Sequence, residues 1–194
     1  MKPSLILIVF FASIFFAQAQ QKLEWDGVYQ LQLSDFQSSS TQIGDSKIYS
    51  IHSASGLDFA FHMTNAEFMF TKNFNQKVSC YFNRSAASIV APDSLFAEDL
   101  VNFARYEFDL AELYARKLRK RLNEEKGTFS DVSFFKPVYE QIQGEFNVRH
   151  SNAGRITDLG RNRQALAALH QEVNQELTAL SDYCKMCKAP KKKK

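Results

Sequence analysis

The chain has 194 residues, 45% of them hydrophobic, including 18 Phe and seven Tyr, and a formal net charge of +3. This length and composition are typical of one globular domain that buries a substantial core. The positive charge comes from the two ends, because setting aside Lys2 and the five lysines at 188 and 191–194 leaves 18 of the 24 basic residues against 21 acidic ones. A slightly acidic body argues against a nucleic-acid-binding surface.

Residues 1–19 have the pattern of a secretory signal peptide. Lys2 gives a positive start, residues 5–16 are apolar, and Ala17-Gln18-Ala19 fits a cleavage site. The apolar run is shorter than the ~20 residues of a membrane-spanning helix, although an uncleaved anchor is the competing interpretation. We therefore expect a secreted or periplasmic protein that starts at Gln20, with no transmembrane segment.

Alternation of apolar and polar residues dominates residues 28–82 and predicts half-buried strands. The clearest runs cover residues 29–33, 57–63 and 78–82, and a hairpin turn is expected at 53–56. Together with the helices that follow, this half predicts an α+β fold. We expect an antiparallel sheet of about four strands packed on a long helix, followed by two further helices.

The long helix is the clearest element of the sequence. Apolar residues recur at helical spacing up to Leu122, Asp93 is a suitable N-cap, and Gly127 is a natural stop. Two further helices are expected at about 133–149 and 162–183.

The polar loop between these two helices is expected at 149–160, where two glycines stand. A single domain is predicted over residues 20–187, and the lysine-rich tail at 188–194 is expected to be disordered. The tail could hold the protein to an anionic polymer or membrane, or serve only as solvated chain.

Charged residues in the long helix fall into two groups. Arg105 with Asp109 and Glu112 with Arg116 stand four residues apart and are expected on the solvent side, where each pair contributes a few tenths of a kcal/mol. Glu107 instead falls on the apolar stripe. A carboxylate buried there needs a partner or a proton, unless it lies at the margin of the stripe and reaches water.

Three cysteines in an exported chain predict one disulfide and one remaining thiol. Cys80 is expected on the inward face of a strand and Cys184 on the inward stripe of the last helix. The favoured pair is therefore Cys80–Cys184, with Cys80–Cys187 as the alternative. A third interpretation makes Cys184 and Cys187 a redox or metal-binding pair, which a single CxxC indicates only weakly.

Residues 108–120, FDLAELYARKLRK, resemble a helix in a family of secreted bacterial proteins described as zinc-dependent proteases. In that family His-Glu-x-x-His precedes the Phe-Asp pair, and a later segment reads Tyr-Asp-x-x-Thr-x-His-Gly. The pair is present here as Phe108-Asp109, and residues 153–160, AGRITDLG, are similar to the later segment. The resemblance implies a peptidase-like α+β scaffold.

The register of this resemblance places other residues on every functional position. Phe103 and Glu107 stand for the two histidines of the helix, Ala104 for the catalytic Glu, and Leu159 for a third ligand. Zinc peptidases need two imidazoles on one helix face, a third ligand and a carboxylate base. Phe, Ala and Leu supply none of these groups, and one carboxylate does not hold zinc. We therefore expect a degenerate site without zinc, without another cofactor and without catalytic residues.

The resulting hypothesis is a pseudoenzyme that binds a peptide or an envelope polymer in the groove between sheet and helix. One alternative is a hydrolase rebuilt around Glu107 and the strand histidines His52 and His62, although hydrogen-bonded or solvated histidines are far commoner than such sites. The other is an envelope-associated structural protein that is tethered by its lysine tail.

Overall fold

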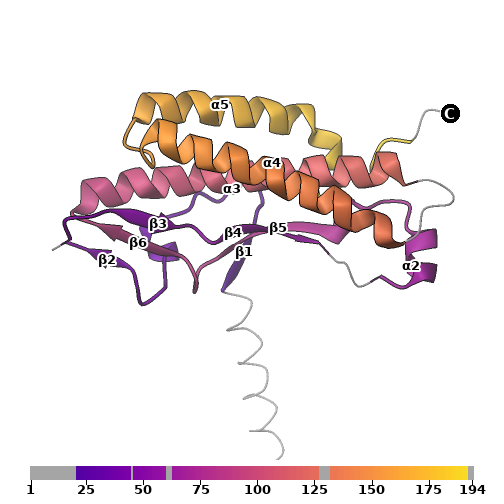
Figure 1. Ribbon diagram of the computed structural model, residues 1–194, viewed down its shortest axis with the longest axis horizontal. Coiled ribbons are helices and arrows are strands. Elements are labelled where there is room, and N and C mark those ends of the chain that lie inside the picture. Colours follow the sequence, from indigo (N-terminus) through magenta and orange to yellow (C-terminus); the bar gives the residue numbers. More distant parts are fainter. Residues whose placement is uncertain (1–20, 45, 60–62, 127–131, 192–194) are drawn as a thin grey trace, which may run out of the picture.

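The computed structural model describes residues 21–44, 46–59, 63–126 and 132–191. Within these ranges the fold is α+β, as predicted, with four helices and two three-stranded sheets (Figure 1). The predicted signal peptide, His62, Gly127 and the last three lysines of the tail lie outside the described residues. None of the described helices combines the length and the apolar character needed to cross a membrane.

The first sheet is antiparallel in the order β1-β5-β4, and the second has the order β2-β6-β3. In the second sheet β2 runs parallel to β6, whereas β3 is antiparallel to it. The strands cover Lys22–Glu24 (β1), Gln42–Ile43 (β2), Ser50–His52 (β3), Ser55–Phe59 (β4), Val78–Asn83 (β5) and Ser88–Ala91 (β6). Of the predicted strands, 78–82 is confirmed as β5 and the start of 57–63 falls in β4.

The prediction of one antiparallel sheet of about four strands is wrong, because the strands form two three-stranded sheets and β2 is parallel to β6. Two local predictions also fail. Residues 29–33 form no strand, because the segment lies on the long helix, where Arg105 Nε donates to Leu31 O at 2.8 Å. Asp35 then accepts a hydrogen bond from Gln32 N at 2.7 Å and closes a short 3-10 helix, Leu33–Asp35. The predicted hairpin at 53–56 is also wrong, because β3 and β4 belong to different sheets. The chain passes between them through Ala54, whose φ is +52°.

Helix α3, Ser94–Glu125, lies between the sheets and the other long helices (Figure 1). It starts as predicted, because the Asp93 side chain accepts a hydrogen bond from Phe96 N at 2.9 Å. Helix α5, Arg163–Ala179, packs on the side of α3 away from the sheets. Helix α4, Phe135–Thr157, packs against both α3 and α5 and crosses α3 toward α2 (Figure 1). A short helix that the sequence pattern did not predict, α2 at Asn65–Phe70, closes one end of the molecule.

Helix α4 ends eight residues later than the 133–149 pattern indicated, because it continues to Thr157. Ala153 and Thr157 are buried and extend the inward stripe past Phe146. The predicted loop at 149–160 is therefore only the short turn after Thr157. This turn needs Gly160, because its φ is +98° and a Cβ there would lie 2.3 Å from Asp99 O.

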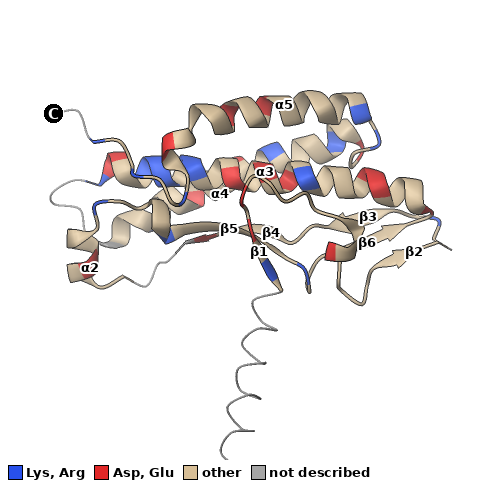
Figure 2. Cartoon of the chain, turned by 180° about the vertical axis from the view of Figure 1, so that it is seen from behind, with Lys and Arg blue, Asp and Glu red and all other residues tan. Residues whose placement is uncertain are grey.

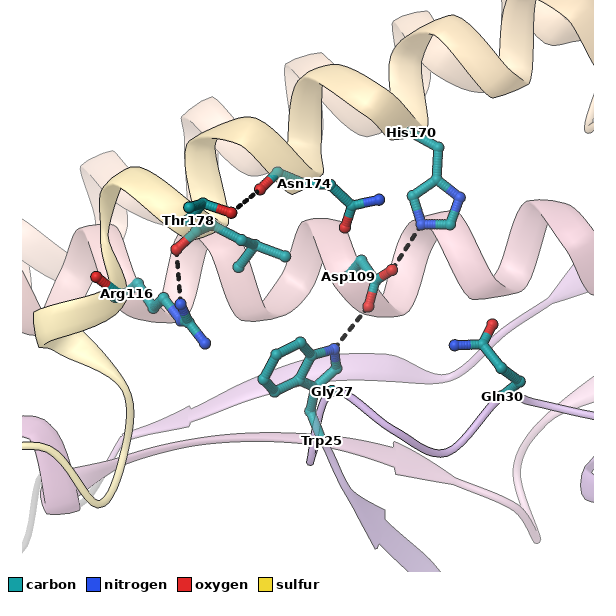
Figure 3. A pocket seen from close by; sticks show the side chains of 10 residues that line it. Trp25, Gly27, Gln30, Asp109, Arg116, His170, Asn174 and Thr178 are labelled. Atoms are coloured by element: carbon teal, nitrogen blue, oxygen red, sulfur yellow. Dashed lines mark hydrogen bonds and ion pairs between the residues drawn. The ribbon is translucent and has the colours of Figure 1, made fainter.

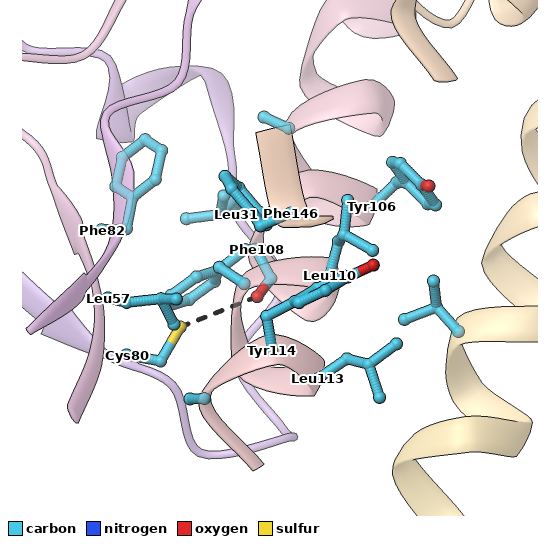
Figure 4. Packing of buried hydrophobic residues seen from close by; sticks show 14 of the residues in the cluster. Leu31, Leu57, Cys80, Phe82, Tyr106, Phe108, Leu110, Leu113, Tyr114 and Phe146 are labelled. Carbon is cyan, nitrogen blue, oxygen red and sulfur yellow. Dashed lines mark hydrogen bonds between the residues drawn. The ribbon is translucent and has the colours of Figure 1, made fainter. Parts of the chain in front are cut away.

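The core lies between α3 and the first sheet and continues between the helices (Figure 4). Phe82 of β5 packs its ring 6.0 Å from that of Phe108 on α3 and 5.4 Å from that of Phe36. Cys80 lies in the same layer and is buried. Burial of α3 on both sides explains why this helix organises the fold.

Candidate functional site

The structure places the degenerate motif positions close to one another. Phe103 and Glu107 stand one turn apart on α3, and the side chains of Phe103 and Leu159 flank the same point of α4. A Cβ built on Gly154 would lie 3.6 Å from Phe103 Cζ and 3.3 Å from Leu159 Cδ2. Hydrocarbon therefore occupies the space between α3 and the turn that follows α4. Ala104 is fully buried beside them and adds no polar group.

Glu107 is buried, with 3% of its surface exposed, so it does not lie at the margin of the stripe. Its partner is His150 of α4, whose Nε2 is hydrogen-bonded to Glu107 Oε1. The His150 ring stacks on Phe146, with ring centroids 5.7 Å apart. Glu107 Oε2 is buried and has no hydrogen-bond partner within the described ranges.

The hydrogen bond with Glu107 raises the pKa of His150 above its usual value, and partial burial opposes that rise. The bond to a carboxylate favours the imidazolium form, because the positive charge strengthens it. The hydrogen bond to Glu107 therefore widens the pH range over which His150 carries its positive charge, and the pair joins α3 to α4. It uses the only chemically active group that the motif positions retain.

A cleft of about 590 Å³ opens between α3, α5 and the segment that follows β1 (Figure 3). At its centre lies Asp109. Its Oδ1 accepts a hydrogen bond from Trp25 Nε1 at 2.7 Å, and its Oδ2 is hydrogen-bonded to His170 Nε2 at 2.6 Å. Gln30 and Asn174 line the same cleft. Asp109 therefore ties the N-terminal segment and α5 to α3, and both of its oxygens are already engaged.

Arg116 forms the next wall of the cleft. Its guanidinium lies 5.2 Å from the centre of the Trp25 ring. Its Nη1 donates to Leu177 O at 2.7 Å and its Nε to Glu112 Oε1 at 3.0 Å. Its Nη2 hydrogen-bonds to no group in the described part of the chain, so this donor remains for a ligand.

Glu112 is the centre of a buried charge network rather than a solvent-side residue. It contacts Arg116 and also Arg119, whose Nη1 lies 2.7 Å from Glu112 Oε1. Arg119 in turn donates to Val78 O of β5 at 2.9 Å and to Tyr183 O at 3.1 Å. The prediction that the Glu112–Arg116 pair lies on the solvent side is wrong, because α3 is covered on both faces and both residues are buried. Figure 2 shows that acidic and basic residues occur along α3.

Arg105 and Asp109, unlike Glu112 and Arg116, do not pair with each other. Arg105 binds Leu31 O, whereas Asp109 binds Trp25 and His170. The polar residues of the 108–120 segment thus hold neighbouring segments in place.

The disulfide joins Cys184 to Cys187, so the predicted pair Cys80–Cys184 and its alternative Cys80–Cys187 are both corrected. Helix α5 ends at Ala179, and Cys184 therefore lies in the turn that follows, not on an inward helical stripe. In this turn Cys187 N donates to Cys184 O at 3.0 Å, and the two Cα atoms are 5.1 Å apart, which suits a disulfide.

Cys80 remains a free, buried thiol, and burial raises its pKa well above the usual value. Its Sγ lies 3.8 Å from Phe108 O. Cys80 and Cys184 nevertheless line one cavity of about 560 Å³, next to the cleft and separated from it by Trp25 and Arg116. The prediction located Cys80 and Cys184 in the same region but paired them incorrectly.

The histidines that form side-chain contacts are not the predicted ones. His52 is exposed on β3, and Glu107 takes His150 as its partner instead. Within the described ranges, no three His, Cys, Asp or Glu side chains come together as a possible metal site. The sequence analysis did not identify Trp25 or His170 as site residues. The one available signal was that Trp25 is the only tryptophan of the chain.

The chain matches no protein-family model, no curated protein and no solved structure. Its function is therefore inferred from its own residues.

Proposed function

We propose that the chain is an exported, non-catalytic binding protein that holds a peptide segment in the cleft between α3, α5 and residues 25–30. The observation that supports it best is that the carboxylate of the cleft, Asp109, and its imidazole, His170, are hydrogen-bonded to each other. Both oxygens of Asp109 are hydrogen-bonded, one to Trp25 and one to His170. A carboxylate held in this way fixes the walls of a binding site and is not available to activate water.

The donors and acceptors that remain suit a peptide backbone. Gln30 and Asn174 each offer an amide oxygen and an amide NH₂, which can pair with a main-chain N–H and C=O. Arg116 Nη2 can donate to a carbonyl or a terminal carboxylate, and the Trp25 ring gives an apolar wall. A saccharide is the other polymer that such groups could bind, and the test below separates the two.

The degenerate motif supports the non-catalytic part of the proposal. Phe103 and Leu159 present only hydrocarbon, and Glu107 is buried against His150. If the resemblance to zinc-dependent proteases reflects common descent, the scaffold has kept the contacts that the 108–120 segment makes with neighbouring segments and has lost its metal-binding residues.

Trp25 is the only tryptophan of the chain and lines both the cleft and the adjoining cavity, so its fluorescence reports on this region, and variants of residues that line only the cleft locate the ligand. The test titrates the chain that starts at Gln20 with a pool of unstructured peptides and, separately, with soluble cell-wall oligosaccharides. We expect the peptide pool to change the Trp25 emission saturably.

The matched variants are Asn174→Ala, which removes a cleft amide from α5, and Asn147→Ala, which removes an exposed amide from α4. Only Asn174→Ala should weaken the response. Saturable binding of oligosaccharide but not peptide would overturn the ligand class. Stoichiometric zinc in protein purified without added metal, lost on chelation together with a peptidase activity, would overturn the non-catalytic role.

A further inference from the structure

Helix α2 presents two apolar side chains to solvent on a rigid support. Phe68 is buried and packs in an aromatic cluster, with its ring centroid 5.1 Å from that of Phe135 and 6.3 Å from that of Phe74. The next two residues point away from this cluster, and Met69 is 70% exposed and Phe70 78% exposed. A single exposed hydrophobic residue is ordinary on a protein surface, but a pair held side by side at one tip is not.

Lys126 fixes the C-terminal end of α2. Its Nζ donates to Phe68 O at 2.6 Å and to Thr71 O at 2.7 Å, and it lies 4.7 Å from the centre of the Phe68 ring. A cation at this position satisfies carbonyls that the helix itself leaves unpaired. The tip that carries Met69 and Phe70 is therefore tied to the C-terminal end of α3.

Lysines surround this tip. A hollow of about 700 Å³ beside α2 is lined by four lysines and by no Asp or Glu. Lys72, Lys188 and Lys191 are exposed and form no ion pair with any residue in the described ranges. The tail that carries Lys188 and Lys191 thus lies at the same end of the molecule as α2 (Figure 2).

An exposed apolar pair beside unpaired lysines is the pattern of a surface that lies on an anionic bilayer. Apolar side chains enter the boundary between headgroups and acyl chains, and lysines stay at the level of the phosphates. We propose that the α2 tip, defined as Met69, Phe70, Lys72, Lys188 and Lys191, docks this protein on an anionic membrane surface.

A bilayer fits these residues better than a soluble polyanion does. Lysines alone would serve a polyanion, which has no use for Met69 and Phe70. The surface lies at the opposite end of the molecule from β2 and β3 and does not use the residues of the Trp25 cleft (Figure 1). Membrane docking and ligand binding are therefore separate properties, and either can fail without the other.

The test measures co-sedimentation with vesicles of equal parts phosphatidylglycerol and phosphatidylcholine, and with vesicles of phosphatidylcholine alone. The chain starts at Gln20, because an apolar leader would itself partition into vesicles. We expect binding to the anionic vesicles only, and weaker binding at high salt. Phe70→Ala should lower the partition coefficient about tenfold. Each of Lys72→Gln and Lys188→Gln should lower it about fivefold.

Residues 47 and 48 give a matched control at the other end of the molecule, because Lys47 is exposed and Ile48 is 68% exposed. Lys47→Gln and Ile48→Ala should leave the binding unchanged. The proposal is overturned if the protein does not bind the anionic vesicles. It is also overturned if the control variants lower the partition coefficient as much as the tip variants do. It is also overturned if Phe70→Ala binds as well as the unaltered chain and soluble polyphosphate displaces the vesicles, which would assign the lysines to a polyanion.

Discussion

Glu107 of α3 and His150 of α4 form a hydrogen-bonded pair in which the carboxylate is buried and the imidazole is 38% exposed at its side chain. Glu107 occupies the position that corresponds, in the zinc-protease resemblance, to a metal-binding histidine. A buried carboxylate at this place is tolerated because a cation from another helix meets it. The pair therefore joins α3 to α4 at that point.

Removing the cation from this pair should destabilise the protein. His150→Ala leaves Glu107 buried without a partner, and we expect the free energy of unfolding to fall by about 2–4 kcal/mol. The double variant Glu107→Leu/His150→Leu should recover most of this loss, because a buried pair can be replaced by hydrocarbon at little cost. Urea denaturation of the three chains measures the effect, and equal stability of the single variant and the unaltered chain would contradict it.

The stability that this pair contributes should depend on pH in a definite direction. The pKa of His150 is raised in the folded protein by its bond to Glu107. Because the pKa of His150 is higher in the folded state than in the unfolded state, protonation of His150 stabilises the folded state. This contribution is fully present below the unfolded-state pKa of about 6.5 and is lost as the pH rises through the folded-state pKa. The stability advantage of the unaltered chain over Glu107→Leu/His150→Leu should therefore shrink as the pH rises above about 6.5. A difference that stays constant or grows over this range would count against the pair.

The buried network around Glu112 should be far more sensitive than an exposed pair on the same helix. Arg119→Met leaves Glu112 with fewer partners and frees Val78 O and Tyr183 O, so a loss of about 3–5 kcal/mol is expected. Arg121→Met removes only a partly exposed pair with Glu125 and should cost less than about 1 kcal/mol. Thermal unfolding of both variants measures the contrast, and similar losses would show that the network is not a structural centre.

Gly160 should tolerate no side chain. Its φ is +98° and an added Cβ would lie 2.3 Å from Asp99 O, so Gly160→Ala should lower stability by about 2 kcal/mol or more. Gly144 lies within α4 with no other atom within 4 Å of an added Cβ. Gly144→Ala should therefore raise stability by about 0.5–1 kcal/mol. Chemical denaturation of both variants gives the signs, and a stabilised Gly160→Ala would refute the close approach.

The cysteines give a chemical check of the chain path. One thiol per chain, Cys80, should react with a maleimide only after denaturation, because it is buried and burial raises its pKa. Peptide mapping without reduction should find Cys184 linked to Cys187. A peptide in which Cys80 is linked to Cys184 would contradict the structure and support the pairing that the sequence favoured.

Local sequence decided several elements correctly. Asp93 was identified as the cap of α3, since a side-chain acceptor before an apolar-periodic run is a signal read from neighbouring residues. The strand predicted at 78–82 followed from the alternation of apolar and polar residues, and the structure has it as β5, Val78–Asn83. Each of these features depends on residues within a few positions of one another.

Features that join distant segments could not be read in this way. Glu107 was placed on the apolar stripe, and the favoured interpretation was a margin position that reaches water. That interpretation is wrong, because Glu107 is buried against His150, which stands 43 positions away on another helix. The solvent-side assignment of Glu112 failed because α3 is buried on both faces, and periodicity within one helix does not show a second covering layer.

The sequence by itself therefore determined the α+β class, the extent of α3 and the absence of histidines at the motif positions, because these depend on residue types and short-range periodicity. Only the tertiary structure decided that Cys184 pairs with Cys187, that Asp109 joins Trp25 to His170, and that the segment after α2 lies beside the tail. These contacts depend on where α5 ends and on how segments far apart in the chain pack against each other, which no local pattern encodes.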